Sequence, residues 1–111
     1  KNNNKIHVFD DIFFNPITFY TLGKIINLII NNKNVGIYNV GSKNGSSKSK
    51  FAKNIAKHFN LNEKLLIPVS YKKILKNTRP NDMRMECKKF ERKFKTKLPT
   101  LQEEIMNKDL L

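Results

Sequence analysis

Arg79, which is followed by Pro80, is the residue whose type and setting most clearly suggest specific chemistry. Only three of the 22 basic residues are arginine, and Pro80 restricts the backbone of the loop around this one. A guanidinium held in a fixed orientation suits bidentate capture of a phosphate. A local salt bridge within the loop explains an arginine at this position equally well, so the residues alone leave both interpretations open.

Residues 41–49 (GSKNGSSKS) follow a strand-like segment and precede a helix-like one, which is the placement of a phosphate-binding P-loop. The P-loop needs a lysine directly after its second glycine, whereas two serines separate Gly45 from Lys48 here. We therefore interpret the segment as a turn with a serine cap for the following helix. The N–H groups of such a helix N-terminus can still attract an anion.

The remaining reactive residue types form no recognisable catalytic or metal-binding set. Asp10 and Asp11 are adjacent, so in a strand they point to opposite faces, and bracing of the next loop suits one of them better. His7 and His58 have no partner at metal-ligand spacing. Cys87 is the single cysteine, which we interpret as a packing or surface thiol in a reducing cytoplasm. The sequence predicts no catalytic residue and no metal site.

Short strands and amphipathic helices alternate along the chain and would position these residues. Strand patterns cover residues 5–10, 36–40 and 65–70, and helical patterns cover residues 17–31, 47–59 and 87–95. Another helix begins after residue 97, where Thr100 and Glu103 have capping-box spacing. Gly23, inside the first helix, predicts a close backbone approach. Three strands alone make a poor sheet, so we expect them to extend or flank a sheet from other sequence.

The net charge of +13 invites a nucleic-acid interpretation. However, 19 of the 22 basic residues are lysine, within a Lys/Asn/Ile bias that a low-GC coding sequence produces without a ligand. Base readout and single-strand binding rely on arginine and exposed aromatic rings, whereas the aromatic residues here fall on apolar helix faces. A solvated lysine-rich surface is favoured, and a stand-alone nucleic-acid-binding module is the alternative. The longest apolar run, residues 25–30, is too short to span a membrane.

Four segments, taken together in this order and spacing, resemble one family. They are VFDDIFFNPIT (8–18), GIYNVGSKNGSSKSKFAKNIAKHF (36–59), IPVS (67–70) with NTRPNDMRM (77–85), and KFERKFKTKLPTLQEEI (89–105). They resemble the C-terminal part of the dTDP-4-dehydrorhamnose reductase and sugar-nucleotide-binding family, in the extended short-chain dehydrogenase/reductase superfamily. Ile17 and Asp82 depart from the Thr and Ser usual in that family, which keeps an epimerase or dehydratase relative as an alternative.

The resemblance implies NAD(P)-dependent reduction of a 4-keto sugar carried on a nucleoside diphosphate. NADPH or NADH would bind an N-terminal Rossmann domain that this sequence lacks, and this segment would bind no cofactor. Residues 1–4 would be a disordered or loop remnant, and residues 5–111 a substrate-binding C-terminal domain.

By the same resemblance, Arg79 would contact the substrate, and Asn15 and Pro16 would shape the loop below the sugar. The implied partners are a nucleoside-diphosphate sugar and the missing domain, with a homodimer left open and no membrane partner. The expected fold class is α/β, the C-terminal portion of an extended Rossmann-type enzyme with about three short strands and four to five helices. The expected location is the cytoplasm, and the chain alone should be inactive.

Overall fold

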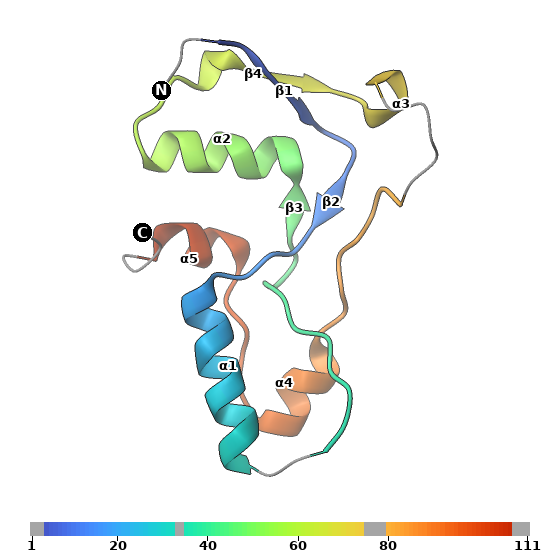
Figure 1. Ribbon diagram of the computed structural model, residues 1–111, viewed down its shortest axis with the longest axis vertical. Coiled ribbons are helices and arrows are strands. Elements are labelled where there is room, and N and C mark those ends of the chain that lie inside the picture. Colours follow the sequence, from blue (N-terminus) through green and yellow to red (C-terminus); the bar gives the residue numbers. More distant parts are fainter. Residues whose placement is uncertain (1–3, 33–34, 75–79, 108–111) are drawn as a thin grey trace. The chain divides into compact units, whose positions relative to one another are not determined.

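The structure, a computed structural model, describes residues 4–32, 35–74 and 80–107 (Figure 1). The chain divides into two compact units, Lys1–Phe14 with Ser46–Met83 and Asn15–Gly45 with Arg84–Leu111. Each unit is therefore assembled from segments that lie far apart in the sequence.

A two-stranded parallel sheet and helix α2 form the centre of the first unit. Strand β1 (Ile6–Phe9) pairs with β4 (Leu66–Val69), and Ile6 lies opposite Leu66. The antiparallel pair β2 (Phe13–Phe14) and β3 (Ser46–Ser47) leads into α2 (Lys48–His58). The 3₁₀ turn η1 (Glu63–Leu65) precedes β4, and the single-turn helix α3 (Tyr71–Ile74) follows it. Helix α2 packs on the parallel sheet of β1 and β4. The ring of Phe51 on α2 lies edge-on to that of Phe14 in β2, with 5.2 Å between the ring centres.

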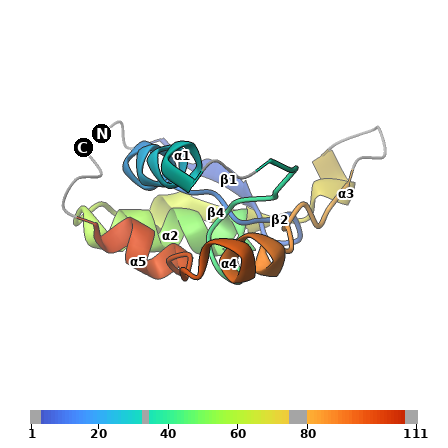
Figure 2. The ribbon, with the colours of Figure 1, turned by 90° about the horizontal axis from the view of Figure 1, so that it is seen from below.

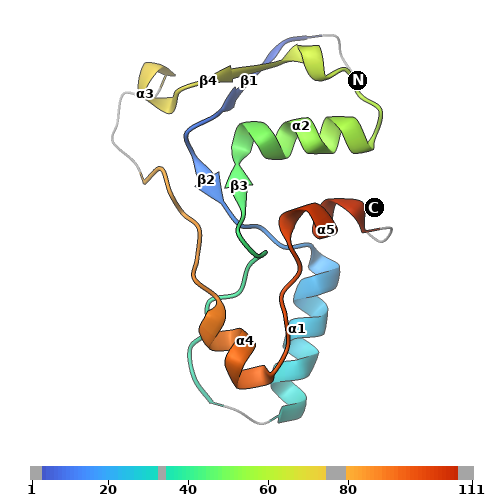
Figure 3. The ribbon, with the colours of Figure 1, turned by 180° about the vertical axis from the view of Figure 1, so that it is seen from behind.

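Three helices form the second unit. They are α1 (Phe19–Asn32), α4 (Lys88–Phe94) and α5 (Leu101–Met106), and Figure 2 shows α1 on one side of the unit with α4 and α5 on the other. The core between them contains Ile25, Phe90, Phe94 and Leu98. Residues 35–41 run beside α4 (Figure 3) and pack Tyr38 and Val40 against this core.

Local sequence signals predicted most of these elements. The hydroxyl of Ser47 accepts a hydrogen bond from the Lys50 N–H at 3.1 Å and caps α2, which confirms the serine cap. Thr100 and Glu103 form the predicted capping box of α5. The strands at residues 5–10 and 65–70, the helices and the mixed α/β class are also confirmed.

Two sequence predictions are wrong for the described residues. Residues 36–40 are extended but belong to no strand pair, because pairing needs a partner segment and composition alone does not supply one. A Cβ atom at Gly23 would meet nothing within 4 Å, so the expected close backbone approach is not found. The strand count also differs, since β2 and β3 have two residues each and are too short to show a period in the sequence.

Replacing Phe90 by alanine should lower the free energy of unfolding by about 3–5 kcal/mol, because a fully buried ring leaves a cavity in the core of the second unit. Phe19→Ala is the matched control, since that ring is 92% exposed, and its effect should stay within roughly 0.5 kcal/mol. Urea unfolding followed by circular dichroism measures both. Equal losses in the two variants would contradict the assignment of the core.

Candidate functional site

Asn15 is buried, and its side-chain amide joins two distant loops of the second unit. Its Nδ2 donates hydrogen bonds to the backbone oxygens of Ser42 (3.1 Å) and Met85 (3.0 Å). Its Oδ1 accepts a hydrogen bond from the Met85 N–H at 3.0 Å. The backbone oxygen of Asn15 also accepts a hydrogen bond from the Ser42 N–H at 3.0 Å. With its amide engaged internally, Asn15 positions the loops at residues 41–42 and 85–87.

Gly41 allows this arrangement because it lies directly against Asn15. A Cβ atom at position 41 would lie 2.6 Å from the backbone oxygen of Asn15 and 2.7 Å from its Nδ2. Any larger residue would therefore displace the loop. Local sequence patterns do not reveal this contact. Asn15 and Gly41 are 26 positions apart, and helical or strand periodicity relates only residues within one element.

Cys87 lies at the edge of the same cluster. Desolvation by burial raises the pKa of its thiol, and the nearby carboxylates of Glu86 and Glu91 add to that effect. Hydrogen bonds from the Gly41 N–H and the Asn15 amide oppose it without reversing it. A thiol with a raised pKa stays protonated at neutral pH and is a poor nucleophile. The predicted packing role of Cys87 agrees with this setting.

The other residues predicted for substrate binding fall in different places. Pro16 is half-buried between Asn15 and the start of α1. Arg79 lies outside the described residues. The stretch after it is held to β2 in the first unit, where the Phe13 N–H donates to the Asn81 oxygen at 2.7 Å and the Met83 N–H donates to the Phe13 oxygen at 2.9 Å.

Asp11 braces a loop of the first unit. The sequence predicted the loop that directly follows Asp11, whereas the structure shows the loop after β4. Its carboxylate accepts hydrogen bonds from the Ser70 hydroxyl at 2.5 Å and from the Tyr71 N–H at 3.0 Å. Desolvation raises the pKa of Asp11, but these hydrogen bonds and the charge of Lys72 outweigh it. The pKa therefore lies below its ordinary value, and the carboxylate is ionised where it caps α3.

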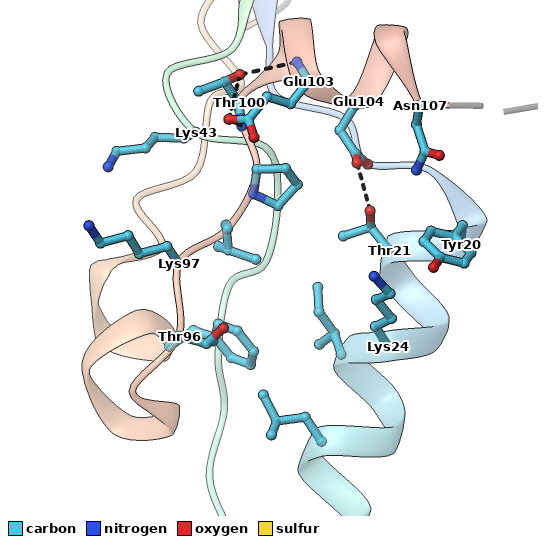
Figure 4. Close-up of a pocket in the computed structure, with 15 residues that line it drawn as sticks. Tyr20, Thr21, Lys24, Lys43, Thr96, Lys97, Thr100, Glu103, Glu104 and Asn107 are labelled. Carbon is cyan, nitrogen blue, oxygen red and sulfur yellow. Dashed lines mark hydrogen bonds between the residues drawn. The ribbon is translucent and has the colours of Figure 1, made fainter. Parts of the chain in front are cut away.

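A pocket of about 600 Å³ lies in the second unit between α1 and the segment that leads into α5 (Figure 4). Apolar side chains contribute much of its lining; they are Ile25, Leu28, Phe90, Leu98 and Pro99. Lys24 lines the pocket from α1 and is exposed, with its Nζ 4.4 Å from the centre of the Tyr20 ring. Lys43 and Lys97 lie on the side opposite α1 (Figure 4). The side chains of Lys43 and Lys97 extend away from α1, so Lys24 is the lysine that lies on the α1 side of the apolar lining (Figure 4).

The two carboxylates that line the pocket are engaged in the structure. Glu104 is buried, and its oxygens accept hydrogen bonds from the Thr18 N–H and from the Thr21 hydroxyl, both at 2.6 Å. A negative charge is stabilising there because the N-terminus of α1 carries the positive end of the helix dipole. Glu103 accepts a hydrogen bond from the Thr100 hydroxyl at 3.1 Å within the capping box.

The described residues contain neither a metal-ligand cluster nor a membrane-spanning helix. Among them, no group of three or more His, Cys, Asp or Glu side chains could hold a metal ion. No helix in the described part of the chain has the length and apolar character needed to cross a membrane.

The fold is shared with solved sugar-nucleotide enzymes. The dTDP-4-dehydrorhamnose reductase of Bacillus anthracis in complex with NADP is 24% identical, with a TM-score of 0.79 over 93% of this chain and 37% of that one. The Yersinia enterocolitica reductase is 19% identical, with a TM-score of 0.73 over 93% and 38% of the two chains. The dTDP-glucose 4,6-dehydratase of Bacillus anthracis with NAD is 15% identical, with a TM-score of 0.63 over 93% and 34%.

The chain thus spans less than two fifths of the length of these enzymes. The model of the RmlD substrate binding domain matches residues 1–108. The chain belongs to this family, and the resemblance seen in the sequence is confirmed. No curated protein matches it.

Replacing Asn15 by alanine should lower the free energy of unfolding by about 1–3 kcal/mol, because it removes the partners of the buried Ser42 oxygen and of the partly buried backbone groups of Met85. Asn15→Asp should destabilise at least as much, since a carboxylate would face two carbonyl oxygens. The control is Asn39→Ala at an exposed position. Urea unfolding of all three variants measures the effect, and an Asn15→Ala loss no larger than the Asn39→Ala loss would contradict the role of Asn15.

The lowered pKa of Asp11 makes the stability of the first unit depend on pH. Its ionised form stabilises the fold above the unfolded pKa of about 3.9, and this contribution is lost as the pH falls through the lower folded pKa. We expect Asp11→Asn to lower the thermal midpoint at pH 7 and to approach the unsubstituted chain as the pH falls below the unfolded pKa and through the lower folded one. Asp10→Asn, at the exposed neighbour, is the control. A difference in thermal midpoint between Asp11→Asn and the unsubstituted chain that stays constant with pH would contradict this assignment.

Proposed function

We propose that this chain is the substrate-binding part of an NAD(P)-dependent reductase that acts on a 4-keto sugar carried by a nucleoside diphosphate. The match of residues 1–108 to the RmlD substrate binding domain carries the proposal. The similarity in fold to two dTDP-4-dehydrorhamnose reductases supports it. The dehydratase shares the fold at a lower TM-score, so an epimerase or dehydratase relative is the alternative.

In this proposal, the cofactor and the reacting groups belong to an N-terminal Rossmann domain outside these 111 residues. NADPH or NADH would bind there. Residues 5–111 would form the substrate-binding domain that closes over the sugar nucleotide, and residues 1–4 would be a loop remnant before it. The reductase solved in complex with NADP and the dehydratase solved in complex with NAD support a nicotinamide cofactor for the whole enzyme. The lone cysteine and its protonated thiol fit a cytoplasmic enzyme.

Arg79 is the proposed contact for the diphosphate. A guanidinium can donate two parallel hydrogen bonds to one phosphate, and charge-assisted bonds of this kind are the strong ones. Pro80 and the hydrogen bonds of Asn81 and Met83 to Phe13 restrain the chain directly after Arg79. Asn15 and Pro16 would act by holding the loop before α1, since the Asn15 amide has its own internal partners.

Arg79→Ala should weaken the binding of dTDP-glucose to the chain by roughly 10-fold or more, because a hydrogen bond to a charged group contributes about 1.5–3 kcal/mol. Arg92→Ala is the matched control, since it removes the same charge from an exposed position on α4. Isothermal titration calorimetry at fixed salt measures both affinities.

Two results would contradict the proposal. One is an affinity for dTDP-glucose that Arg79→Ala and Arg92→Ala change equally. The other is an affinity for a short RNA that exceeds the affinity for dTDP-glucose and falls steeply as the salt concentration rises. That result would favour a basic nucleic-acid-binding module.

A further inference from the structure

Two neighbouring hollows on the surface of the second unit are lined by basic side chains. One, of about 600 Å³, is lined by Lys43, Glu91, Arg92, Lys95, Thr96 and Lys97. The other, of about 180 Å³, shares Lys43 and Glu91 with it and includes Lys88. We call the basic residues of the two hollows the basic groove; they are Lys43, Lys88, Arg92, Lys95 and Lys97, and all of them are exposed.

Helix α4 supplies one part of the basic groove. Lys88 and Arg92 lie four residues apart on one face of the helix, while Phe90 and Phe94 are buried in the core. Lys95 follows as the C-cap, in the left-handed conformation with a φ of 49°. Basic side chains near the end of a helix suit the negative end of its dipole. The helix alone therefore accounts for Arg92 and Lys95 without any ligand.

The helix dipole does not account for Lys43 and Lys97, which reach the groove from outside α4. The Lys43 N–H donates to the Pro99 oxygen at 2.7 Å, so the two segments that carry these lysines are tied together. Both side chains extend to the same side, away from α1 (Figure 4). A lysine-rich coding sequence explains the number of lysines but not this gathering. Ammonium groups brought together in this way repel each other unless an anion lies between them.

The carboxylates of the two hollows are engaged with backbone N–H groups. The Oε2 of Glu91 accepts a hydrogen bond from the Leu98 N–H at 2.8 Å. The Oε1 of Glu86, in the smaller hollow, accepts one from the Lys88 N–H at 2.7 Å. Within the described ranges of the chain, no hydrogen bond or ion pair involves the cationic groups of the basic groove. A hollow lined mainly by one sign of charge concentrates its potential and stabilises an anionic partner.

We propose that the basic groove is a docking site for an acidic segment of a partner protein, with several glutamate or aspartate side chains in succession. Its carboxylates pair with the cationic groups of the groove, and the Thr96 hydroxyl can donate a further hydrogen bond in the larger hollow. Charge complementarity of this kind raises the association rate and selects the partner more than it adds affinity. The inference goes beyond the proposed function, because it concerns a protein partner and not the sugar nucleotide.

Other anionic occupants fit the basic groove less well. Single-stranded nucleic acid binds through aromatic rings that stack on its bases, and among the described residues no aromatic side chain lines either hollow. All the cations except Arg92 are lysines, which bind as point charges and lack the planar fork with which arginine reads base edges. A second copy of the chain offers only 9 acidic residues against 22 basic ones, so two copies repel each other.

Fluorescence anisotropy of a labelled oligoglutamate peptide, titrated with this chain, tests the proposal. We expect binding that weakens as the salt concentration rises, because salt screens exposed charge pairs. At physiological salt, Lys43→Glu and Lys97→Glu should each weaken it by roughly 5-fold or more, since each reverses a charge within reach of the peptide. Lys50→Glu is the matched control, with the same charge change at an exposed position on α2. It should change the affinity by less than about 2-fold.

The thermal midpoint of each variant shows whether it is folded. If a charge reversal prevents folding, the double variant with Lys43→Gln and Lys97→Gln removes two charges without reversing either, and it should weaken binding by roughly 5-fold. An oligoglutamate that does not bind at low salt would overturn the proposal. Equal losses in the two groove variants and in Lys50→Glu would also overturn it, because net charge alone would then attract the peptide. An oligouridylate that binds more tightly, and is weakened by the same substitutions, would overturn the choice of a protein partner.

The basic groove contains none of the residues proposed to act on the sugar nucleotide, which are Arg79, Asn15 and Pro16. Lys43→Glu and Lys97→Glu should therefore keep the affinity for dTDP-glucose within about 2-fold of the unsubstituted value. Loss of dTDP-glucose binding in these two variants, with Lys50→Glu unaffected, would place the diphosphate in the basic groove and reject a separate partner.

Discussion

The second unit depends on the buried amide of Asn15. Its hydrogen bonds to Ser42 and Met85 fix two loops that are 27 and 70 residues away in sequence. A buried amide is stabilising only when its donors and acceptor are paired, because an unpaired one keeps the full penalty of leaving water. The contact with Gly41 leaves no room for a side chain. The approach of Tyr38 and Val40 to the core, and the start of α4, follow from this junction.

Carboxylates in both units have structural partners. Asp11 caps α3, Glu104 accepts hydrogen bonds from Thr18 and Thr21 at the start of α1, and Glu103 closes its own capping box. In each case a negative charge meets N–H or hydroxyl donors, and helix N-termini favour such charges. These carboxylates hold helices and loops in place, and the reacting groups are proposed to lie in the rest of the enzyme.

Local patterns in the sequence predicted local structure well. Apolar spacing identified α1 and α2, and single residues identified the caps at Ser47 and Thr100. The partners of Asn15 and Glu104 could not be predicted, because their spacing along the chain follows no helical or strand period. The strand predicted at residues 36–40 is extended but unpaired in the structure, because composition indicates an extended backbone and does not identify a pairing partner. The order and spacing of the motifs were sufficient to identify the family. The roles of Arg79, Asn15 and Pro16 in binding a substrate stay predictions.

The central proposal is that this chain binds a sugar nucleotide, with Arg79 as the contact for the diphosphate and with Asn15 and Pro16 holding the loop before α1. Mapping NMR chemical-shift changes during a titration with dTDP-glucose tests it most directly. The account predicts that the changes concentrate at residues 15–17 and 79–85 and saturate with the ligand. Changes confined to the lysines of α2, or none at millimolar ligand, would contradict it.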